Sequence, residues 1–208
     1  MSRDAERSRA AILDAARELF AERGYEATSL AAVAAVADLS RGTPSYFYGS
    51  KERLYAAVLE RVFEERERAA RKACEPLHAW AAAAAGSQLD EPMETAVDGY
   101  LGFLLDNPAF LKLLQREELA GASRLREVPR ESRAIAAAFE AVRGVARQRG
   151  LREFKVEDAV LLFISLTFSP LSQRSTLLAA LGRDLADRRV RRNHVRLVAD
   201  QLLYLVGA

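Results

Sequence analysis

The residues of this chain that are best suited to contact another molecule are Arg41, Gly42 and Thr43, which directly follow Ser40. Ser40 has a side chain that commonly caps a helix N-terminus, so the sequence predicts a helix that continues through Phe47. The first turn of that helix holds one guanidinium, one residue without a side chain and one hydroxyl, which suit a hydrophobic core poorly. An arginine there can pair bidentately with guanine, and a threonine can contact a base edge or a thymine methyl. The pattern indicates a helix that enters the major groove of DNA, with a solvated helix start as the alternative for Arg41 taken alone.

A shorter helix precedes this predicted recognition helix and would position it. Thr28 or Ser29 is placed to cap it, and Asp38 follows it as one of the few residue types that tolerate a left-handed turn. Leu39 is then expected to fill the space between the two helices. Two helices around a tight turn form a helix-turn-helix over about residues 29–48. The apolar residues of the shorter helix recur at helical spacing and form its buried stripe: Leu30, Val33, Ala34 and Ala37.

A longer amphipathic helix upstream would support this pair, with Gly24 expected just after its C-terminus. Downstream, Ser50 is placed to cap another helix whose first residue is Lys51. Free backbone amides and one ammonium there can converge on a single DNA phosphate, the alternative being a solvated surface lysine. The buried face of the upstream helix would consist of Ile12, Leu13, Ala16, Leu19 and Phe20.

Two sequence runs in this region resemble the signature of the tetracycline-repressor (TetR-like) family. They are I-L-D-A-A-R-E-L-F-A-E-R-G-Y-E-A-T-S at residues 12–29 and L-S-R-G-T-P-S-Y-F-Y-G-S-K-E-R-L at residues 39–54, and the matching motifs span about residues 7–60. The resemblance implies an all-α fold with an N-terminal three-helix DNA-binding domain, residues 6–66, that contains the helix-turn-helix. An α-helical effector-binding and dimerisation domain, residues 77–208, would follow.

The same resemblance implies which residues contact DNA. Pro44 and Ser45 stand where the family most often has Leu-Tyr, so the usual tyrosine contact must come from Ser45 or from Tyr46. Pro44 is expected at the end of the first helical turn, where it would tilt or shorten the helix. The resemblance implies that Arg41 and Thr43 contact base edges and that the backbone at Gly42 closely approaches the DNA. The implied phosphate or sugar contacts are Ser29, Ser45, Tyr46 and Lys51.

Composition favours an all-helical protein that binds specific DNA sites. The chain has 208 residues, half of them apolar, with only 11 glycines and 6 prolines. A net charge of +2 does not suit a protein that coats nucleic acid indiscriminately. The positive potential must be local, and the candidates for it are Arg3, Arg7, Arg9, Arg41, Lys51 and Arg53.

Several other classes of protein are disfavoured. Cys74 is the single cysteine and His78 and His194 are the only histidines, so no intrachain disulfide, cysteine-rich zinc site or obvious catalytic constellation is available. No glycine-rich phosphate loop or metal-ligand spacing occurs, and we expect no enzyme activity, cofactor or metal. The absence of an apolar leader and of any apolar run near 18 residues predicts a cytoplasmic protein without a membrane segment.

The second half of the chain is predicted to consist of helices. The helix that begins at Lys51 should end near Pro76, its charged run at 64–72 should form a solvated face, and residues 77–91 should form a helix end and loop. Further helices should end at Asn107, start at Pro108 and cover about 131–149.

The last two predicted helices carry excess apolar surface. Residues 156–168 are apolar on almost every side and should be ended by Pro170, and the final helix covers about 190–206. The resemblance implies that two such helices form a four-helix bundle with a second copy. One short recognition helix covers few base pairs, so we expect a homodimer on a near-palindromic operator in double-stranded DNA. A basic cluster lies at the start of the final helix: Arg188, Arg189, Arg191 and Arg192.

The resemblance further implies a small-molecule effector in a pocket between the middle helices. No residue identifies this effector, and we expect a mostly apolar molecule. Gln115, Glu117 or Glu118 would be its polar anchor, and ordinary core packing is the more common role for each aromatic candidate. The candidate pocket residues are Trp80, Tyr100, Phe103, Phe110, Leu114, Phe139, Phe163 and Phe168.

The predicted function is that of a transcriptional regulator, a repressor that a small molecule releases from its operator. A family-like protein that does not repress, either an activator or an interaction module, is the alternative. An all-helical enzyme is the alternative that the residues support least.

Overall fold

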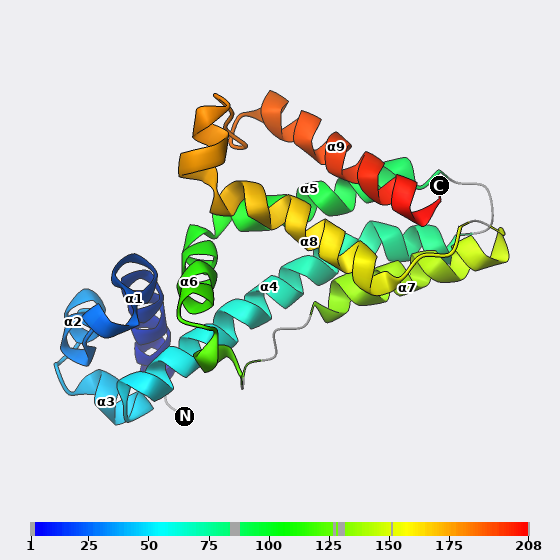
Figure 1. Ribbon diagram of the computed structural model, residues 1–208. Helices are drawn as coiled ribbons and strands as arrows, with labels where there is room; N and C mark the ends of the chain where they lie inside the picture. The colour runs from blue at the N-terminus through cyan, green and yellow to red at the C-terminus, as the bar shows by residue number, and fades with distance from the viewer. Residues whose placement is uncertain (1–2, 84–87, 127, 129–131, 151, 208) are drawn as a thin grey trace. The chain divides into compact units, whose positions relative to one another are not determined.

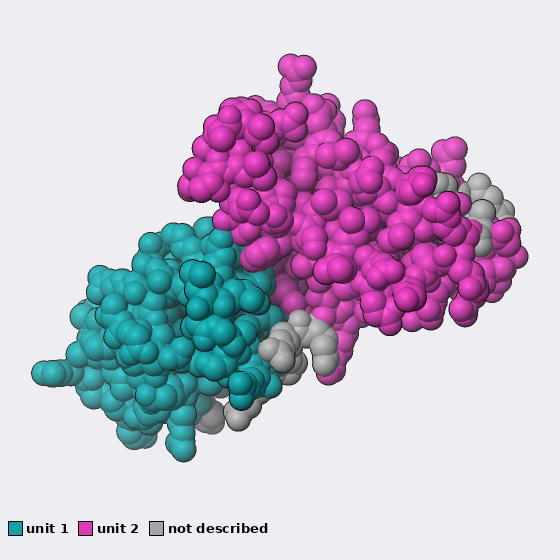
Figure 2. All heavy atoms as spheres, viewed as in Figure 1, with its two compact units in different colours: residues 1–65, 108–130 teal, residues 66–107, 131–208 magenta. Residues whose placement is uncertain are grey.

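The computed structural model describes residues 3–83, 88–126, 128, 132–150 and 152–207, and every regular element in these ranges is a helix (Figure 1). The predicted all-α fold is therefore confirmed. Contacts divide the chain into two compact units, residues 1–65 with 108–130 and residues 66–107 with 131–208 (Figure 2). The predicted domains, 6–66 and 77–208, remain a prediction, and the contact-based units differ from them because residues 108–130 pack with the N-terminal helices.

The first unit places a helix-turn-helix on a support helix. Helix α1 packs against α2 and α6, and α2 packs against α3. Its core is apolar, with Ile12, Phe20 and Leu54 fully buried. The elements of this unit are α1 (Arg3–Ala27), α2 (Leu30–Val36), α3 (Thr43–Tyr48), the first half of α4 (Lys51–Ala82), α6 (Pro108–Leu119) and the short 3₁₀ turn η1 (Ser123–Leu125).

Gly24 kinks α1 three residues before its end. Its φ of 83° lies in the region that favours glycine, as expected for a residue that interrupts a helix. The kink frees carbonyls, and Arg116 donates to two of them, Nε to Ala21 O at 2.9 Å and Nη2 to Glu22 O at 2.7 Å. A Cβ on Gly24 would lie 2.9 Å from Arg116 Nη1. This glycine is therefore required by its backbone conformation, and a side chain there would also make the Arg116 guanidinium shift.

Helix α4 does not end near Pro76, contrary to the prediction, but continues to Ala82. A proline inside a helix costs about 3 kcal/mol because it loses one hydrogen bond and clashes with the preceding turn. Burial offsets this cost here, since Cys74, Leu77 and Trp80 are all buried on either side of the proline. Within the helix end and loop predicted at 77–91, the helix continues through residue 82, and residues 84–87 lie outside the described part of the chain.

The second unit packs its helices around an aromatic core. Helix α5 contacts both α8 and α9, and α7 lies against α8. The predicted helix boundary at Asn107 and Pro108 is confirmed. The elements are the second half of α4, α5 (Asp90–Asp106), α7 (Arg133–Gln148), α8 (Val156–Ser172), the π-turn η2 (Arg174–Leu178) and α9 (Arg188–Val206).

Pro170 also lies inside a helix, because α8 continues to Ser172 instead of ending at the proline. Pro170 has no N–H to donate to the carbonyl of Leu166, four residues earlier. The imidazole Nε2 of His194 lies 2.9 Å from that carbonyl oxygen. A proton on Nε2 therefore replaces the missing donor and joins α9 to α8. None of the helices in the described residues is long and apolar enough to cross a membrane.

Candidate nucleic-acid interface and effector region

The recognition helix α3 begins at Thr43, two residues later than predicted from Ser40 as its N-cap. Gly42 occupies the N-cap position and makes no side-chain hydrogen bond. Ser40 instead belongs to the preceding turn, in which its backbone carbonyl accepts a hydrogen bond from Thr43 N at 2.9 Å. The two hydroxyls, Ser40 Oγ and Thr43 Oγ1, lie 2.6 Å apart. Ser40 therefore orients Thr43 without capping the helix. Arg41 is exposed in this turn and has no hydrogen bond or ion pair with any residue that the structure describes.

Pro44 stands in the first turn of α3 rather than at its end, which corrects the prediction. Backbone N–H groups in a first turn have no partner within the helix, so the proline loses no hydrogen bond there. Its ring is buried. The departure from the usual Leu-Tyr pair is thus compatible with an undistorted helix start.

The tight turn between α2 and α3 has the predicted left-handed residue. Asp38 has a φ of 54°, and Leu39 N donates to Ala34 O at 3.0 Å. Ser29 caps α2, since its Oγ accepts from Ala32 N at 3.1 Å. Thr28, the other candidate, is buried instead and donates to Gly24 O at 2.8 Å.

Three further predicted contact residues are exposed at the same helix-turn-helix. Ser45 and Tyr46 lie on the solvent side of α3, and 84% of Tyr46 is accessible. Gly42 has an ordinary negative φ of −84°, and a Cβ there would meet no atom within 4 Å. Neither backbone conformation nor internal packing therefore requires a glycine at this position, so its small size can serve the approach of an external molecule.

Lys51 has an interaction that the sequence did not reveal. Its Nζ donates to Tyr25 O at 3.0 Å and to Glu26 O at 3.4 Å, and it lies 4.3 Å from the centre of the Tyr25 ring. The ammonium thus binds carbonyls at the end of α1, where a positive charge is favourable. Ser50 caps α4 as predicted, because its Oγ accepts from Arg53 N at 3.3 Å. The bond from Lys51 to α1 joins residues 26 apart, and no local pattern signals it.

Arg9 is a second residue whose role the sequence did not reveal. Its guanidinium carbon lies 5.3 Å from the centre of the Phe47 ring, and its carbonyl accepts from the Tyr48 hydroxyl at 3.3 Å. These contacts hold α3 against α1. The sequence indicated only that Arg9 carries a positive charge and did not indicate its contacts with Phe47 and Tyr48.

An acidic residue reduces the positive charge next to Lys51. Glu52 Oε1 accepts from the Tyr25 hydroxyl at 2.8 Å. Its own backbone N–H, the Ser50 hydroxyl and Tyr25 lower the pKa of Glu52 to about 2, while burial and the bond to Glu52 raise the pKa of Tyr25 to about 12. Glu52 is therefore ionised at neutral pH.

The predicted effector residues do not all come together. Tyr100, Phe139 and Phe163 form one aromatic cluster, with ring centres 5.4 Å apart for Tyr100 and Phe163 and 6.1 Å apart for Phe139 and Phe163. Phe103 also belongs to this cluster, since the centre of its ring lies 6.3 Å from that of Tyr100. Burial raises the pKa of the Tyr100 hydroxyl to about 12, a shift that the positive charge of Arg66 opposes.

The other candidates lie elsewhere. Trp80 is buried beside Arg149, whose guanidinium carbon is 5.2 Å from its ring, and Phe168 is only half-buried. Helix α6, in the first unit, holds Phe110, Leu114 and the proposed polar anchors Gln115, Glu117 and Glu118.

Two of these α6 residues have clear partners within the first unit. The ring of Phe110 packs on Phe63 at 5.7 Å. Glu117 is 1% exposed and accepts from the Tyr55 hydroxyl at 2.8 Å. Burial, with Glu117 beside it, raises the pKa of Tyr55. Both residues therefore hold α6 to α4 within the first unit.

Part of the charged run of α4 is buried rather than solvated, contrary to the prediction. Arg66 is only 6% exposed, and its Nη2 lies 3.6 Å from Glu67 Oε2. The other carboxylate oxygen of Glu67 accepts from Ala134 N at 2.7 Å, in the first turn of α7. Alternating charges on a helix do not reveal which of them a neighbouring helix will cover.

Comparison with known proteins assigns both parts of the chain. The family described as "Bacterial regulatory proteins, tetR family" matches residues 12–58, and the one described as "Tetracyclin repressor-like, C-terminal domain" matches residues 90–202. The HTH-type transcriptional repressor NicS of Pseudomonas putida is 27% identical over 97% of this chain and 93% of its own length. The HTH-type transcriptional regulator UidR of Escherichia coli is 35% identical, over 37% of this chain and 38% of its own.

Solved structures show the same fold. A TetR-family regulator from Mesorhizobium loti aligns over the whole of both chains with a TM-score of 0.73 and 18% identity. PfmR from Thermus thermophilus aligns over 93% of this chain and 97% of its own, with a TM-score of 0.64 and 21% identity. From its helix-turn-helix and from these matches, the chain belongs to the TetR family of helix-turn-helix transcriptional regulators.

Proposed function

We propose that this protein is a sequence-specific repressor that binds a near-palindromic operator as a homodimer and leaves it when a small-molecule effector binds. The observation that carries the proposal is the turn from Arg41 to Thr43. It presents a guanidinium without a partner among the described residues, a glycine that nothing internal requires and a hydroxyl oriented by Ser40. Such a turn suits the edges of base pairs in a major groove.

The phosphate contacts in this proposal come from residues around that turn. Ser29, Ser45 and Tyr46 are exposed at the helix-turn-helix, where hydroxyls can donate to phosphate oxygens. Lys51 would contact a phosphate while its ammonium remains at the end of α1. In that position it would fix the register of the protein on the duplex and contribute little to the choice of sequence.

The homodimer in this proposal uses the outer faces of α8 and α9. Leu161 on α8 is 66% exposed, and Leu197 and Tyr204 on α9 are 53% and 71% exposed. Leu197 and Tyr204 are seven residues apart and so share one face of their helix. Large apolar side chains exposed in this way would be covered by the same face of a second copy.

The effector in this proposal binds beside Tyr100, Phe103, Phe139 and Phe163, where large apolar rings gather in the second unit. Arg66 lies buried in the same unit, where it is paired with Glu67 and its positive charge acts on Tyr100. Release from DNA would require only that the effector bind more tightly to a conformation that cannot engage the operator. The relative NicS is a transcriptional repressor by name, which supports the direction of regulation.

The test is selection of bound sequences from a random duplex pool at near-physiological salt, with Arg41→Ala protein alongside. We expect an inverted repeat from the parent protein and a motif blurred at one position per half-site from the variant. Analytical ultracentrifugation of Leu197→Glu protein tests the dimer in parallel, because a charge on that face should yield monomers. A folded, dimeric parent protein that enriches no sequence would overturn the proposal.

A further inference from the structure

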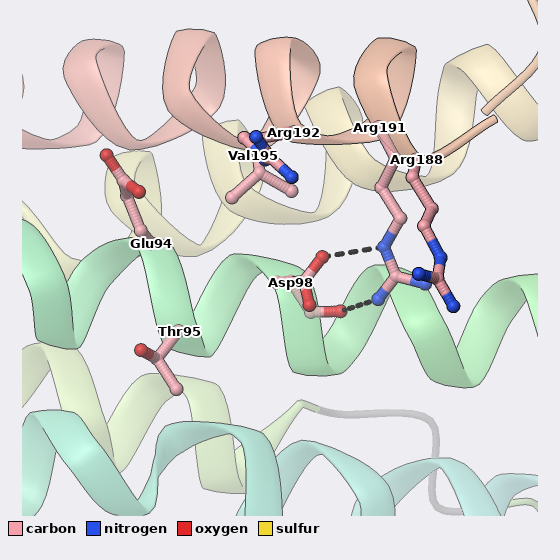
Figure 3. A pocket seen from close by; sticks show the side chains of 7 residues that line it. All are labelled: Glu94, Thr95, Asp98, Arg188, Arg191, Arg192 and Val195. Carbon is pink, nitrogen blue, oxygen red and sulfur yellow. Dashed lines mark hydrogen bonds and ion pairs between the residues drawn. The ribbon is translucent and has the colours of Figure 1, made fainter. Parts of the chain in front are cut away.

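A second candidate binding site lies in the second unit, between the first turns of α9 and the middle of α5. It is an open pocket of about 460 Å³, within the size range of small-molecule sites. Figure 3 shows Arg188 and Arg191 reaching from α9 toward α5, with their guanidinium groups close together. The pocket is lined by Glu94, Thr95, Asp98, Arg188, Arg191, Arg192 and Val195.

Helix periodicity explains why three arginines line one pocket. Arg191 and Arg192 follow Arg188 by three and four residues, and Val195 follows it by seven, so all four share one face of α9. Val195 is buried at this face. Val195 therefore packs α9 against its neighbours, while the three arginines place three positive charges at the pocket.

The two acidic residues of the pocket already have partners. Arg191 donates from Nε to Asp98 Oδ1 at 2.6 Å and from Nη2 to Asp98 O at 2.8 Å. Gly102 allows this approach, since a Cβ there would lie 2.9 Å from Arg191 Nη2. Glu94 forms an ion pair with Arg196, with 3.6 Å between Oε1 and Nε.

Arg188 and Arg192, by contrast, are exposed and have no hydrogen bond or ion pair with any residue that the structure describes. Two uncompensated guanidinium groups at i and i+4 repel each other, and an anion between them would remove that repulsion. The pocket thus carries positive charge that its own acids do not neutralise.

The start of α9 does not itself supply the anion site. Asp187 caps the helix, and its Oδ1 accepts from Arg189 N at 2.8 Å and from Val190 N at 3.0 Å. The two amides are therefore occupied, and a ligand in the pocket would be bound by side chains. Guanidinium groups bind the paired oxygens of phosphates and carboxylates with two parallel hydrogen bonds.

We propose that this pocket binds a small multivalent oxyanion, carrying phosphate or carboxylate groups, through Arg188 and Arg192, with Arg191 held beside Arg188 by Asp98 (Figure 3). The site is separate from the aromatic cluster proposed for the effector and goes beyond the proposed function. A bound anion would connect α9 to α5 and stabilise the fold.

Isothermal titration calorimetry of the full chain, without DNA, tests this proposal with inorganic pyrophosphate and, separately, citrate at constant ionic strength. We expect saturable binding of at least one probe, with one site per chain, and the tighter probe identifies phosphate or carboxylate as the preferred group. The double variant Arg188→Gln, Arg192→Gln should weaken this binding by about tenfold or more, because each guanidinium supplies charge-assisted hydrogen bonds.

Two control variants separate the pocket from general electrostatic attraction. Arg189→Gln removes the same charge from the same turn but from a residue outside the pocket lining, and Arg23→Gln removes it from an exposed position of α1. Both should bind the probe as the parent does. The proposal is overturned if neither probe binds saturably up to about 10 mM, or if Arg189→Gln weakens binding as much as the double variant. Circular dichroism spectra identical to the parent's are the condition for comparing the variants.

Discussion

In residues 28–54 most of the polar groups proposed to contact DNA are exposed on and around the short helix α3, whereas in the second unit the aromatic residues proposed to contact an effector pack on one another. Arg41 is exposed and has no partner among the described residues, while Phe139 and Phe163 are completely buried. A residue of the first kind can be changed without disturbing the fold. A residue of the second kind contributes to folding and to ligand contact at once.

This contrast predicts that stability and DNA binding can be changed independently in the first region, whereas stability and effector binding cannot be changed independently in the second. Lys51 lies in the first region but should affect both stability and DNA binding, because its ammonium binds α1 carbonyls and is also proposed to contact a phosphate. The four substitutions below test the contrast.

Phe163→Ala should have the largest effect, a loss of about 3 to 5 kcal/mol in the free energy of unfolding, as for other buried phenylalanines. Its ring is fully buried and contacts both Tyr100 and Phe139. Denaturant unfolding at fixed protein concentration measures the loss, and Phe168→Ala, at a half-buried position, should cost clearly less. A cost below about 1 kcal/mol for Phe163→Ala would mean that the ring borders an open cavity, and the contrast between the regions would fail.

Arg41→Ala should weaken operator binding by about 1 to 3 kcal/mol and relax base preference at one position per half-site. The unfolding free energy should not change, because the side chain has no partner among the described residues. Fluorescence anisotropy with labelled duplexes measures the affinity. Arg23→Ala, which removes the same charge from an exposed position of α1, is the matched control and should leave base preference intact.

Lys51→Ala should lower the unfolding free energy by about 1 kcal/mol, the usual size for the loss of an intramolecular hydrogen bond. It should also weaken binding to all DNA sequences alike and flatten the dependence of affinity on salt. Arg53→Ala removes the same charge two residues later without breaking the bonds to α1, so it should spare stability. If Lys51→Ala leaves both the stability and the salt slope unchanged, its bonds to α1 and its phosphate contact are both refuted.

Gly42→Ala should have the smallest effect on the fold and is the sharpest test of the turn. A Cβ there meets nothing within 4 Å and φ is negative, so we expect unchanged stability or a gain of up to about 1 kcal/mol. DNA binding should nevertheless weaken, because the methyl group would occupy the space of the approaching duplex. Equal affinity of the variant and the parent for the operator would show that DNA does not approach this backbone.

The features that the sequence predicted correctly are local. Asp38 as the left-handed residue, Ser29 and Ser50 as caps and Pro108 as a helix start depend on neighbours within four residues, and all four are present in the structure. Such features follow from the conformational preferences of single residues.

The features that the sequence missed depend on packing between distant segments. Pro76 and Pro170 were expected to end helices, but burial holds α4 together through Pro76. Next to Pro170, His194 supplies the donor that the proline lacks. Lys51 was assigned to DNA alone because its bonds to α1 span 26 residues of sequence.

The candidate effector residues show the same limit. Aromatic residues could be found in the sequence, but whether Phe110 lies with Phe63 or with Phe163 depends on how the helices pack. The arginines of α9 were visible as a cluster, whereas the pairing of Arg191 with Asp98 was not.

The most direct test of this account is competition binding to the selected operator with each base pair substituted in turn, using the parent, Arg41→Ala and Lys51→Ala proteins at one salt concentration. We predict that Arg41→Ala loses discrimination at a single base pair in each half-site, while Lys51→Ala keeps the whole preference profile at lower affinity. If Arg41→Ala keeps full discrimination at every position, the turn before α3 does not select the operator sequence, and the central claim is contradicted.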